Sequence, residues 1–280
     1  MAEPKYIVTH GGRAHFDDLM SVSLLLYKYP SSCVIRENNL DNLSEEIMNN
    51  AVIVDISGKY DGKKFFDHHQ DLQLNSSFVL VLKHFFDIDL SILYSIFSYY
   101  QFYDLKDRFG PEKALSLMNI TCSDTTFYLS PIEDYIISEE FSKRNVIYPD
   151  DWFHNVLRKL GEYFLKNIKK QLEDIKSFKE IVEVKIISGY KCALSLSRGF
   201  PLIYYKKLLD DIIIIIQEND RDKNHINLIS LDTEKINFLK LKNTKLEYIF
   251  VHPNGFLAVI DKKQNYEQYI NAVVEEKKEG

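Results

Sequence analysis

The sequence predicts an α/β fold, in which a parallel β-sheet with flanking helices is followed by a smaller α+β domain. Short apolar runs of strand type at residues 6–8, 33–35 and 51–54 alternate with segments of helical spacing. Toward the C-terminus the pattern changes to β-branched runs that are typical of strands. We therefore expect two domains, residues 1–180, which end in a long connecting helix, and residues 181–280.

Apolar spacing also predicts the helices of the first domain. One helix is expected at residues 17–27 and a shorter one at residues 43–48. Residues 77–105 are almost continuously apolar and aromatic, which favours helices packed on the sheet. In residues 152–178 apolar side chains recur three and four positions apart, so this stretch predicts the long helix. Expected helix starts are Ser44, Ser76, Ser77 and Pro111.

The second domain is expected to consist mainly of strands. The isoleucines at residues 212–216 predict a central buried strand, because the run is continuous and β-branched. The remaining elements are strands at residues 182–186, 193–196, 226–231, 248–251 and 256–260, and a final helix at residues 266–274.

Composition and termini restrict the possible location and partners. A net charge of −6 gives no overall attraction to nucleic acid duplexes or anionic membranes. The sequence has no apolar run near the roughly 20 residues of a spanning helix, and from its first residues we expect no secretory leader. Cys33, Cys122 and Cys192 form no CxxC pair, which favours a reducing compartment. We expect an intracellular protein without membrane contact, in the cytoplasm, with the nucleus or mitochondrion as alternatives.

Three groups of histidines and carboxylates each follow a run of strand type. His10 and His15 stand five apart on a glycine-containing turn, and Asp17 follows where a helix is expected to start. Asp55 comes directly after residues 51–54, and Asp67-His68-His69 follows two phenylalanines. Because ligands bind beyond the carboxyl ends of parallel strands, these side chains are expected to meet at one edge of the sheet. Imidazoles and carboxylates together are suited to divalent cations.

The third group allows a division of roles. Adjacent residues on a strand point to opposite faces, so His68 and His69 should differ, one binding metal and the other reaching substrate. Asp67 is expected to orient one of the imidazoles through a hydrogen bond without itself binding metal. Asp55 has two oxygens that could contact two cations, which suits the floor of a two-cation site.

These groups resemble the DHH phosphoesterase superfamily, which is named for its Asp-His-His triplet. Within it, the pattern is similar to the melanocyte-proliferating-gene (MYG) branch of exonuclease-like proteins. That branch opens with Thr-His, a glycine-containing turn, a second histidine and an acidic pair, here Thr9-His10, Gly11-Gly12, His15 and Asp17-Asp18. The aromatic residue follows the second histidine here, whereas the branch places it before. The later motifs correspond to Asp55, Asp67-His68-His69-Gln70, Ser76-Ser77, Phe250-Val251-His252 and Gly255-Phe256.

The resemblance implies a metal centre. Its implied ligands are His10, His15, Asp17, Asp55 and His68. One more aspartate is expected after the next helix, and Asp104 is favoured. The branch has Asp-Asn-Gly where this chain has Asp107-Arg108-Phe109, so Asp107 stays open as the alternative. Two divalent cations are implied, and mixed histidine and carboxylate ligation favours Mn²⁺ over Mg²⁺.

The resemblance also implies a reaction, two-metal hydrolysis of a phosphoester. In it Asp55 and His68 belong to the catalytic centre as ligands, and His69 stabilises charge on the phosphate. Substrate contacts from the second domain are expected at His252, Asn254 and Gly255. The chain lacks the Gly-Gly-His motif of the best-known DHH nucleases, and Asn-Gly is also a strong turn signal, so a turn role for His252 is the alternative.

The expected function is that of an exonuclease that hydrolyses RNA or short oligonucleotides. The segment Tyr204-Tyr205-Lys206-Lys207 offers rings and charges for nucleic acid, with an ordinary amphipathic surface as the alternative. Rival functions are a manganese pyrophosphatase, a cyclic-dinucleotide phosphodiesterase, or a regulatory protein that binds metal or nucleotide without hydrolysis. Pyrophosphatases of the superfamily carry Ser-Arg-Lys, whereas this chain has Ser197-Arg198-Gly199.

Overall fold

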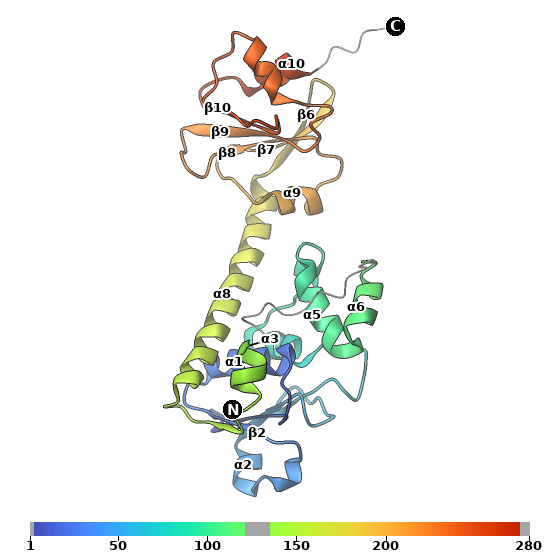
Figure 1. The fold of residues 1–280 in the computed structure, drawn as a ribbon, viewed down its shortest axis with the longest axis vertical. Helices are drawn as coiled ribbons and strands as arrows, with labels where there is room; N and C mark the ends of the chain where they lie inside the picture. Colours follow the sequence, from blue (N-terminus) through green and yellow to red (C-terminus); the bar gives the residue numbers. More distant parts are fainter. Residues whose placement is uncertain (1–2, 121–134, 275–280) are drawn as a thin grey trace. The chain divides into compact units, whose positions relative to one another are not determined.

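The computed structural model describes residues 3–120 and 135–274. The chain forms two compact units that divide after Lys170, within helix α8 (Trp152–Ile181), and each unit contains its own β-sheet (Figure 1). The predicted combination of strands and helices in an α/β chain with two sheets is confirmed. The boundary predicted from the sequence lies near the C-terminal end of this same helix.

The sheet of the first unit has the order β4-β3-β1-β2-β5. Strands β1 (Tyr6–Thr9), β2 (Cys33–Arg36), β3 (Ala51–Val54) and β4 (Phe65–Phe66) are parallel to their neighbours. At the edge, β5 (Val146–Ile147) pairs with β2 in the antiparallel direction, so the expectation of a purely parallel sheet was wrong there. Because β1, β3 and β4 are adjacent and parallel, the loops that carry the three ligand groups leave the sheet at the same edge.

Helices cover both faces of this sheet. On one face, η1 (Leu40–Asn42) and α2 (Glu45–Asn49) shield Val8 and Ile53. On the other, α1 (Phe16–Lys28) is almost wholly buried and packs against α3 (Ser77–Phe86). Among the described residues the unit also contains α4 (Ser91–Tyr94), α5 (Ser98–Phe109), α6 (Pro111–Leu117), the π-helix η2 (Tyr135–Phe141) and the start of α8.

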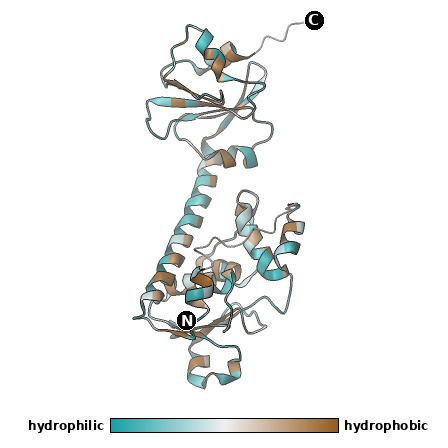
Figure 2. Ribbon diagram, viewed as in Figure 1, coloured by the Kyte–Doolittle hydropathy of each residue, from teal (hydrophilic) through white to brown (hydrophobic). Residues whose placement is uncertain are grey.

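Helix α8 has the amphipathic pattern that its sequence predicts, and both apolar and polar residues occur along its length (Figure 2). Phe153, Leu157 and Leu165 are buried, whereas the Lys166 side chain is exposed and pairs with Glu162. Close packing on α1 requires a glycine at position 161. A Cβ atom there would lie 2.1 Å from the backbone oxygen of Ser23.

The second unit is built on a six-stranded sheet of order β10-β11-β9-β8-β7-β6. Only β7 and β8 are parallel to each other, and the predicted isoleucine strand, β8, is central and buried. The strands are β6 (Glu183–Ile187), β7 (Tyr190–Ser195), β8 (Ile214–Glu218), β9 (His225–Ser230), β10 (Phe250–Val251) and β11 (Leu257–Asp261). The helices are α9 (Leu202–Leu208), η3 (Phe238–Asn243) and α10 (Tyr266–Val273).

The two tyrosines of α9 are core residues. Tyr204 and Tyr205 are fully buried and pack on the ring of Phe178, and the Tyr205 hydroxyl donates to Oε1 of Gln217 at 2.9 Å. The interpretation of these rings as stacking platforms for bases was therefore wrong. The sequence pattern did not reveal that α9 turns its aromatic side chains inward.

Cys33 and Cys192 are free thiols, as expected, and Cys122 lies outside the described residues. In the parts of the chain that the structure describes, no helix has both the length and the apolar character needed to cross a bilayer.

Candidate metal centre

Loops after β1, β3 and β4 bring the predicted ligands together. Two groups of side chains have ligand atoms within 4.8 Å of one another, and Asp55 belongs to both. The first is His10, His15 and Asp55, and the second is Asp55, Asp67, His68 and His69. A pocket of about 340 Å³ opens over them. This is the convergence at the carboxyl edge of parallel strands that the sequence predicted.

Asp55 stands at the centre of this arrangement. Its backbone has a φ of 58°, a left-handed conformation that aspartate adopts more readily than most residues, and this turns the chain sharply after β3. Its Oδ2 lies 3.5 Å from Nε2 of His10, and its Oδ1 lies 3.6 Å from Nδ1 of His68. Oδ1 also accepts a hydrogen bond from the Ser77 hydroxyl at 3.1 Å. Each carboxylate oxygen thus faces a different histidine, as a bridging ligand requires.

His68 and His69 differ in exposure, but not because adjacent residues of a strand point to opposite faces. They lie beyond the two-residue strand β4, and their rings stack with centroids 4.4 Å apart. His68 is buried, whereas the His69 side chain is 60% exposed. Burial, followed by the charge of His69, lowers the pKa of His68 to about 4, which keeps this imidazole neutral and able to act as a ligand.

Asp67 holds His69 in place, as the sequence predicted for a supporting carboxylate. Its Oδ1 accepts from Nδ1 of His69 at 2.6 Å and from the His69 backbone, and its Oδ2 accepts from the Gly58 backbone. Burial alone would raise the pKa of Asp67, but these hydrogen bonds outweigh it and lower the pKa to about 2. The hydrogen bond that His69 donates to Asp67 raises the pKa of His69. The raised pKa and the orientation that Asp67 imposes suit His69 for contact with a phosphate.

A second polar chain supports His10, and its role was not predicted. Asp18 Oδ2 lies 3.1 Å from Nε2 of His10 and 3.7 Å from the guanidinium of Arg36. Arg36 is buried and donates to the carbonyls of Phe141 and Gly12. Burial lowers the pKa of His10, but the hydrogen bond and charge of Asp18 outweigh it and the net shift is upward. The available signal was an arginine placed, unusually, at the end of a buried strand.

Asp17 contacts both the start of α3 and the ligand His68, two features that the sequence analysis treated separately. It is buried, and its oxygens accept from the backbone N–H groups of Ser77 at 2.9 Å and Phe78 at 2.6 Å, at the start of α3. Asp17 Oδ2 also lies 3.6 Å from Nδ1 of His68. Ser77 was predicted only as a helix start, yet its hydroxyl lies 3.3 Å from the same nitrogen. Asp17 therefore caps α3 while it faces the ligand group.

The two aspartates of α5 occupy different environments. Asp104 is buried and accepts from the Ser76 backbone at 2.7 Å and from the Asn75 side chain at 2.9 Å, with Arg108 at 3.3 Å. Asp107 has an enclosed Oδ2 that finds no hydrogen-bond partner among the described residues. The oxygens of Asp104 are thus satisfied by the protein, whereas Asp107 leaves one oxygen unused.

The electrostatics of the cluster favour a cation. Burial, followed by neighbouring carboxylates, raises the pKa of Asp17 to about 7 and raises the pKa values of Asp55 and Asp107 well above their ordinary range. Nε2 of His68 is enclosed and, within the described part of the chain, has no hydrogen-bond partner. Crowded carboxylates beside unpartnered buried atoms are costly in a protein alone, and bound divalent cations would relieve both. The donor set therefore fits a divalent metal.

His252, Asn254 and Gly255 lie in the second unit, in the turn between β10 and β11. The His252 ring accepts from the Asn254 backbone at 3.1 Å, and its carbonyl accepts from the Gly255 backbone. Gly255 has a φ of 74°, as a tight turn requires. These contacts account for the Asn-Gly signal as a turn, and the expected substrate contacts of these residues stay a prediction.

Comparison with protein families finds a match within the first unit. Residues 6–101 match the model of the uncharacterised protein family UPF0160, MYG1_exonuc. The MYG1 protein C694.04c of Schizosaccharomyces pombe is 36% identical over 67 residues, which is 23% of this chain and 19% of that protein. Over this stretch the chain is similar to the MYG1 proteins. MYG1 protein YER156C of Saccharomyces cerevisiae is 35% identical over 68 residues, which cover 24% of this chain and 19% of the relative.

The matched region has clear limits. It contains the predicted ligands from His10 to His68 and ends at residue 101, before Asp104 and Asp107. The chain covers about a fifth of the length of these curated relatives, since the share is 19% for both. The similarity therefore concerns the ligand groups of the first unit, and it leaves the choice between the two α5 aspartates to geometry.

Proposed function

We propose that the chain is a metal-dependent phosphodiesterase of the DHH type that shortens RNA or short oligonucleotides from an end. The observation that carries the proposal is the position of Asp55, whose two oxygens face two different ligand groups. A carboxylate shared between two such groups is the arrangement of two-cation phosphoester hydrolysis. The name of the matching family, MYG1_exonuc, supports the same class of reaction.

The ligands would divide between two cations, with Mn²⁺ preferred and Mg²⁺ weaker. His10 and His15 would hold one cation, His68 would hold the other, and Asp55 would serve both. When bound, such cations polarise the phosphoester and lower the pKa of an attacking water. His69, which Asp67 orients and whose pKa Asp67 raises, would donate to a phosphate oxygen as negative charge develops on it.

Asp107 is the better sixth ligand. The sequence favoured Asp104, but hydrogen bonds from Ser76, Asn75 and Arg108 occupy its oxygens. Asp107 has the unpartnered oxygen, and the charges of Asp17 and Asp18 contribute to its raised pKa. A cation would remove the cost of that buried oxygen, whereas at Asp104 it would have to displace existing hydrogen bonds.

The assignment can be tested by comparing the two aspartates directly. Asp107→Asn should weaken Mn²⁺ binding, measured by calorimetry, by at least about tenfold and leave the melting temperature of the metal-free chain nearly unchanged. Asp104→Asn should lower the melting temperature, because the α3 start loses a charged acceptor. The opposite pattern would return the ligand to Asp104.

The reaction is tested with RNA and DNA oligonucleotides labelled at either the 5′ or the 3′ end. The full chain with Mn²⁺ should release mononucleotides from one end, and excess pyrophosphate should not compete strongly. Asp55→Ala should abolish hydrolysis while circular dichroism shows an intact fold. Asp41→Ala is the control, because Asp41 is exposed and lies outside both ligand groups. Turnover of Asp55→Ala near the rate of the unmodified chain would refute the proposal, and preferential cleavage of pyrophosphate would favour the small-phosphate alternative.

A further inference from the structure

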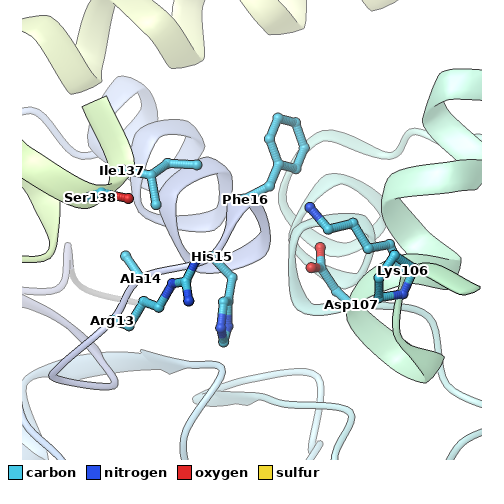
Figure 3. A pocket seen from close by; sticks show the side chains of 9 residues that line it. Arg13, Ala14, His15, Phe16, Lys106, Asp107, Ile137 and Ser138 are labelled. Atoms are coloured by element: carbon cyan, nitrogen blue, oxygen red, sulfur yellow. The ribbon is translucent and has the colours of Figure 1, made fainter. Parts of the chain in front are cut away.

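A second pocket, of about 420 Å³, adjoins the metal centre and shares His15 with it. Its walls come from the start of α1, the later part of α5, the first residue of α6 and the π-helix η2 (Figure 3). All of these elements belong to the first unit. Its volume falls within the roughly 300–1,000 Å³ of small-molecule sites, which exceeds what a bare phosphate needs.

Two cationic side chains line this pocket. Arg13 precedes α1 and Lys106 lies on α5, and in Figure 3 they stand on opposite sides of the pocket with His15 between them. Neither forms an ion pair with a carboxylate among the described residues. The positive charges of Arg13 and Lys106 contribute, after burial, to the lowered pKa of His15. In a chain with a net charge of −6, two unpaired cations beside a metal centre indicate an anionic ligand.

The remaining wall is apolar and well fixed. Phe16, Ala14, Pro111 and Ile137 contribute to it. The Phe16 ring stacks on Tyr103, with centroids 3.9 Å apart and planes within 14°, so one face of the ring is already held. An apolar wall beside cationic groups suits a molecule that carries both a phosphate and a nucleoside, and inorganic phosphate would leave the apolar wall uncovered.

From this pocket we infer a nucleotide subsite beside the reacting phosphate, in which Arg13 and Lys106 bind a phosphate and the apolar wall receives the nucleoside. The inference rests on the proposed function, since it supplies the position of a neighbouring nucleotide of the substrate. It also narrows the substrate class to chains of at least two nucleotides. A substrate without a second phosphate and nucleoside makes none of these contacts.

Asp107 gives the subsite an order of binding. Its carboxylate also lines the pocket, so a cation bound at Asp107 would add positive charge to this side of the subsite. The field around Arg13 and Lys106 would then favour a phosphate more strongly than in the metal-free chain. Nucleotide binding should therefore be tighter with Mn²⁺ than without it, and it should weaken as salt is raised.

Binding of adenosine monophosphate to the full chain tests the subsite, because this monoester is not a substrate for a phosphodiesterase. Calorimetry with Mn²⁺ should show binding that weakens at least about tenfold in Arg13→Ala/Lys106→Ala. Lys113→Ala is the matched control, because this exposed α6 lysine does not line the pocket, and it should bind like the unmodified chain. Inorganic phosphate should bind more weakly than adenosine monophosphate. Equal affinity for the two, or no binding of the nucleotide, would overturn the subsite.

A parallel assay separates this inference from the proposed function. With Mn²⁺, the double variant should keep its turnover of bis-p-nitrophenyl phosphate, which has no neighbouring phosphate, while KM for an oligonucleotide rises at least about tenfold. Normal oligonucleotide KM and normal nucleotide binding in the double variant would overturn the subsite and leave the hydrolase intact. Nucleotide binding that depends on Arg13 and Lys106, in a chain that cleaves no phosphodiester, would keep the subsite as a nucleotide site and refute the hydrolase.

Discussion

Asp17 makes the stability of the metal-free chain depend on pH. Burial and nearby carboxylates raise its pKa from 3.8 to about 7, so the folded chain holds a proton that the unfolded chain releases. The stabilisation by this proton is complete below pH 3.8 and disappears as the pH rises through about 7. Each unit of pKa difference between the folded and unfolded chain corresponds to about 1.4 kcal/mol. The free energy of unfolding lost through Asp17 alone is therefore on the order of 4 kcal/mol.

The effect of Asp17 on the free energy of unfolding is best measured between pH 6.5 and 8. The pKa of His68 is lowered to about 4, so its contribution to stability increases between about pH 4 and 6.5 and opposes the loss there. Above about pH 7 that effect is nearly complete, and the lowered pKa of His15 acts in the same opposing direction. The raised pKa values of Asp55, Asp107, His10 and His69 all act in the same direction as Asp17. The free energy of unfolding should then fall by about 1 kcal/mol through Asp17 and further through the other groups.

Urea unfolding in EDTA at pH 6.5, 7, 7.5 and 8 measures this fall, and a second series with Mn²⁺ should reverse it. Because the cation binds the deprotonated carboxylates, its affinity rises with pH, and saturation at 100 times Kd adds about 2.7 kcal/mol. Asp17→Asn should show a shallower decrease in EDTA, and Asp41→Asn should match the unmodified chain. A free energy of unfolding that is constant or rising in EDTA would refute the reasoning, as would an unchanged slope in Asp17→Asn.

Three further substitutions test local features. Gly161→Ala should lower the free energy of unfolding by about 2–3 kcal/mol in urea titrations, because its Cβ meets the Ser23 carbonyl at 2.1 Å, and an unchanged value would contradict this packing. Asp67→Asn should lower the pKa of His69 in an NMR titration, since the hydrogen bond that His69 donates to the Asp67 carboxylate is the main cause that raises it. Gly255→Ala should lower the melting temperature seen by calorimetry, because of its φ of 74° and a side chain 2.0 Å from the new Cβ; a stable variant would refute the turn geometry.

Most of the first-unit sheet was predictable because its signals are local. Apolar runs at β1, β2 and β3 are short and buried, and their alternation with helices indicates parallel order. Parallel order in turn places His10 and Asp55 at one edge. By contrast, β5 has two residues and no periodic pattern, and only its pairing with β2 makes it a strand.

Features that depend on tertiary packing were not predictable. The carbonyls bound by Arg36 come from Gly12 and Phe141, more than a hundred positions apart in the chain, so no spacing rule links them. The tyrosines of α9 were misinterpreted for the same reason, because the position of Phe178 decides which way they face. The histidines and aspartates of the ligand groups can be recognised from their residue types alone. The role of a supporting residue such as Arg36 depends on neighbours that only the folded chain brings close.

The start of α3 explains why the aspartates of the site differ as experimental targets. Its first backbone N–H groups are bound by two carboxylates, Asp104 at Ser76 and Asp17 at Ser77 and Phe78. Such contacts stabilise a helix N-terminus, so substitution of either aspartate alters the fold as well as the metal centre. Asp55 accepts the Ser77 hydroxyl rather than a backbone N–H group of α3, and Asp107 has an oxygen without a partner among the described residues. Loss of activity in an Asp17 variant is therefore ambiguous, whereas loss in an Asp55 or Asp107 variant with intact stability reports on the chemistry.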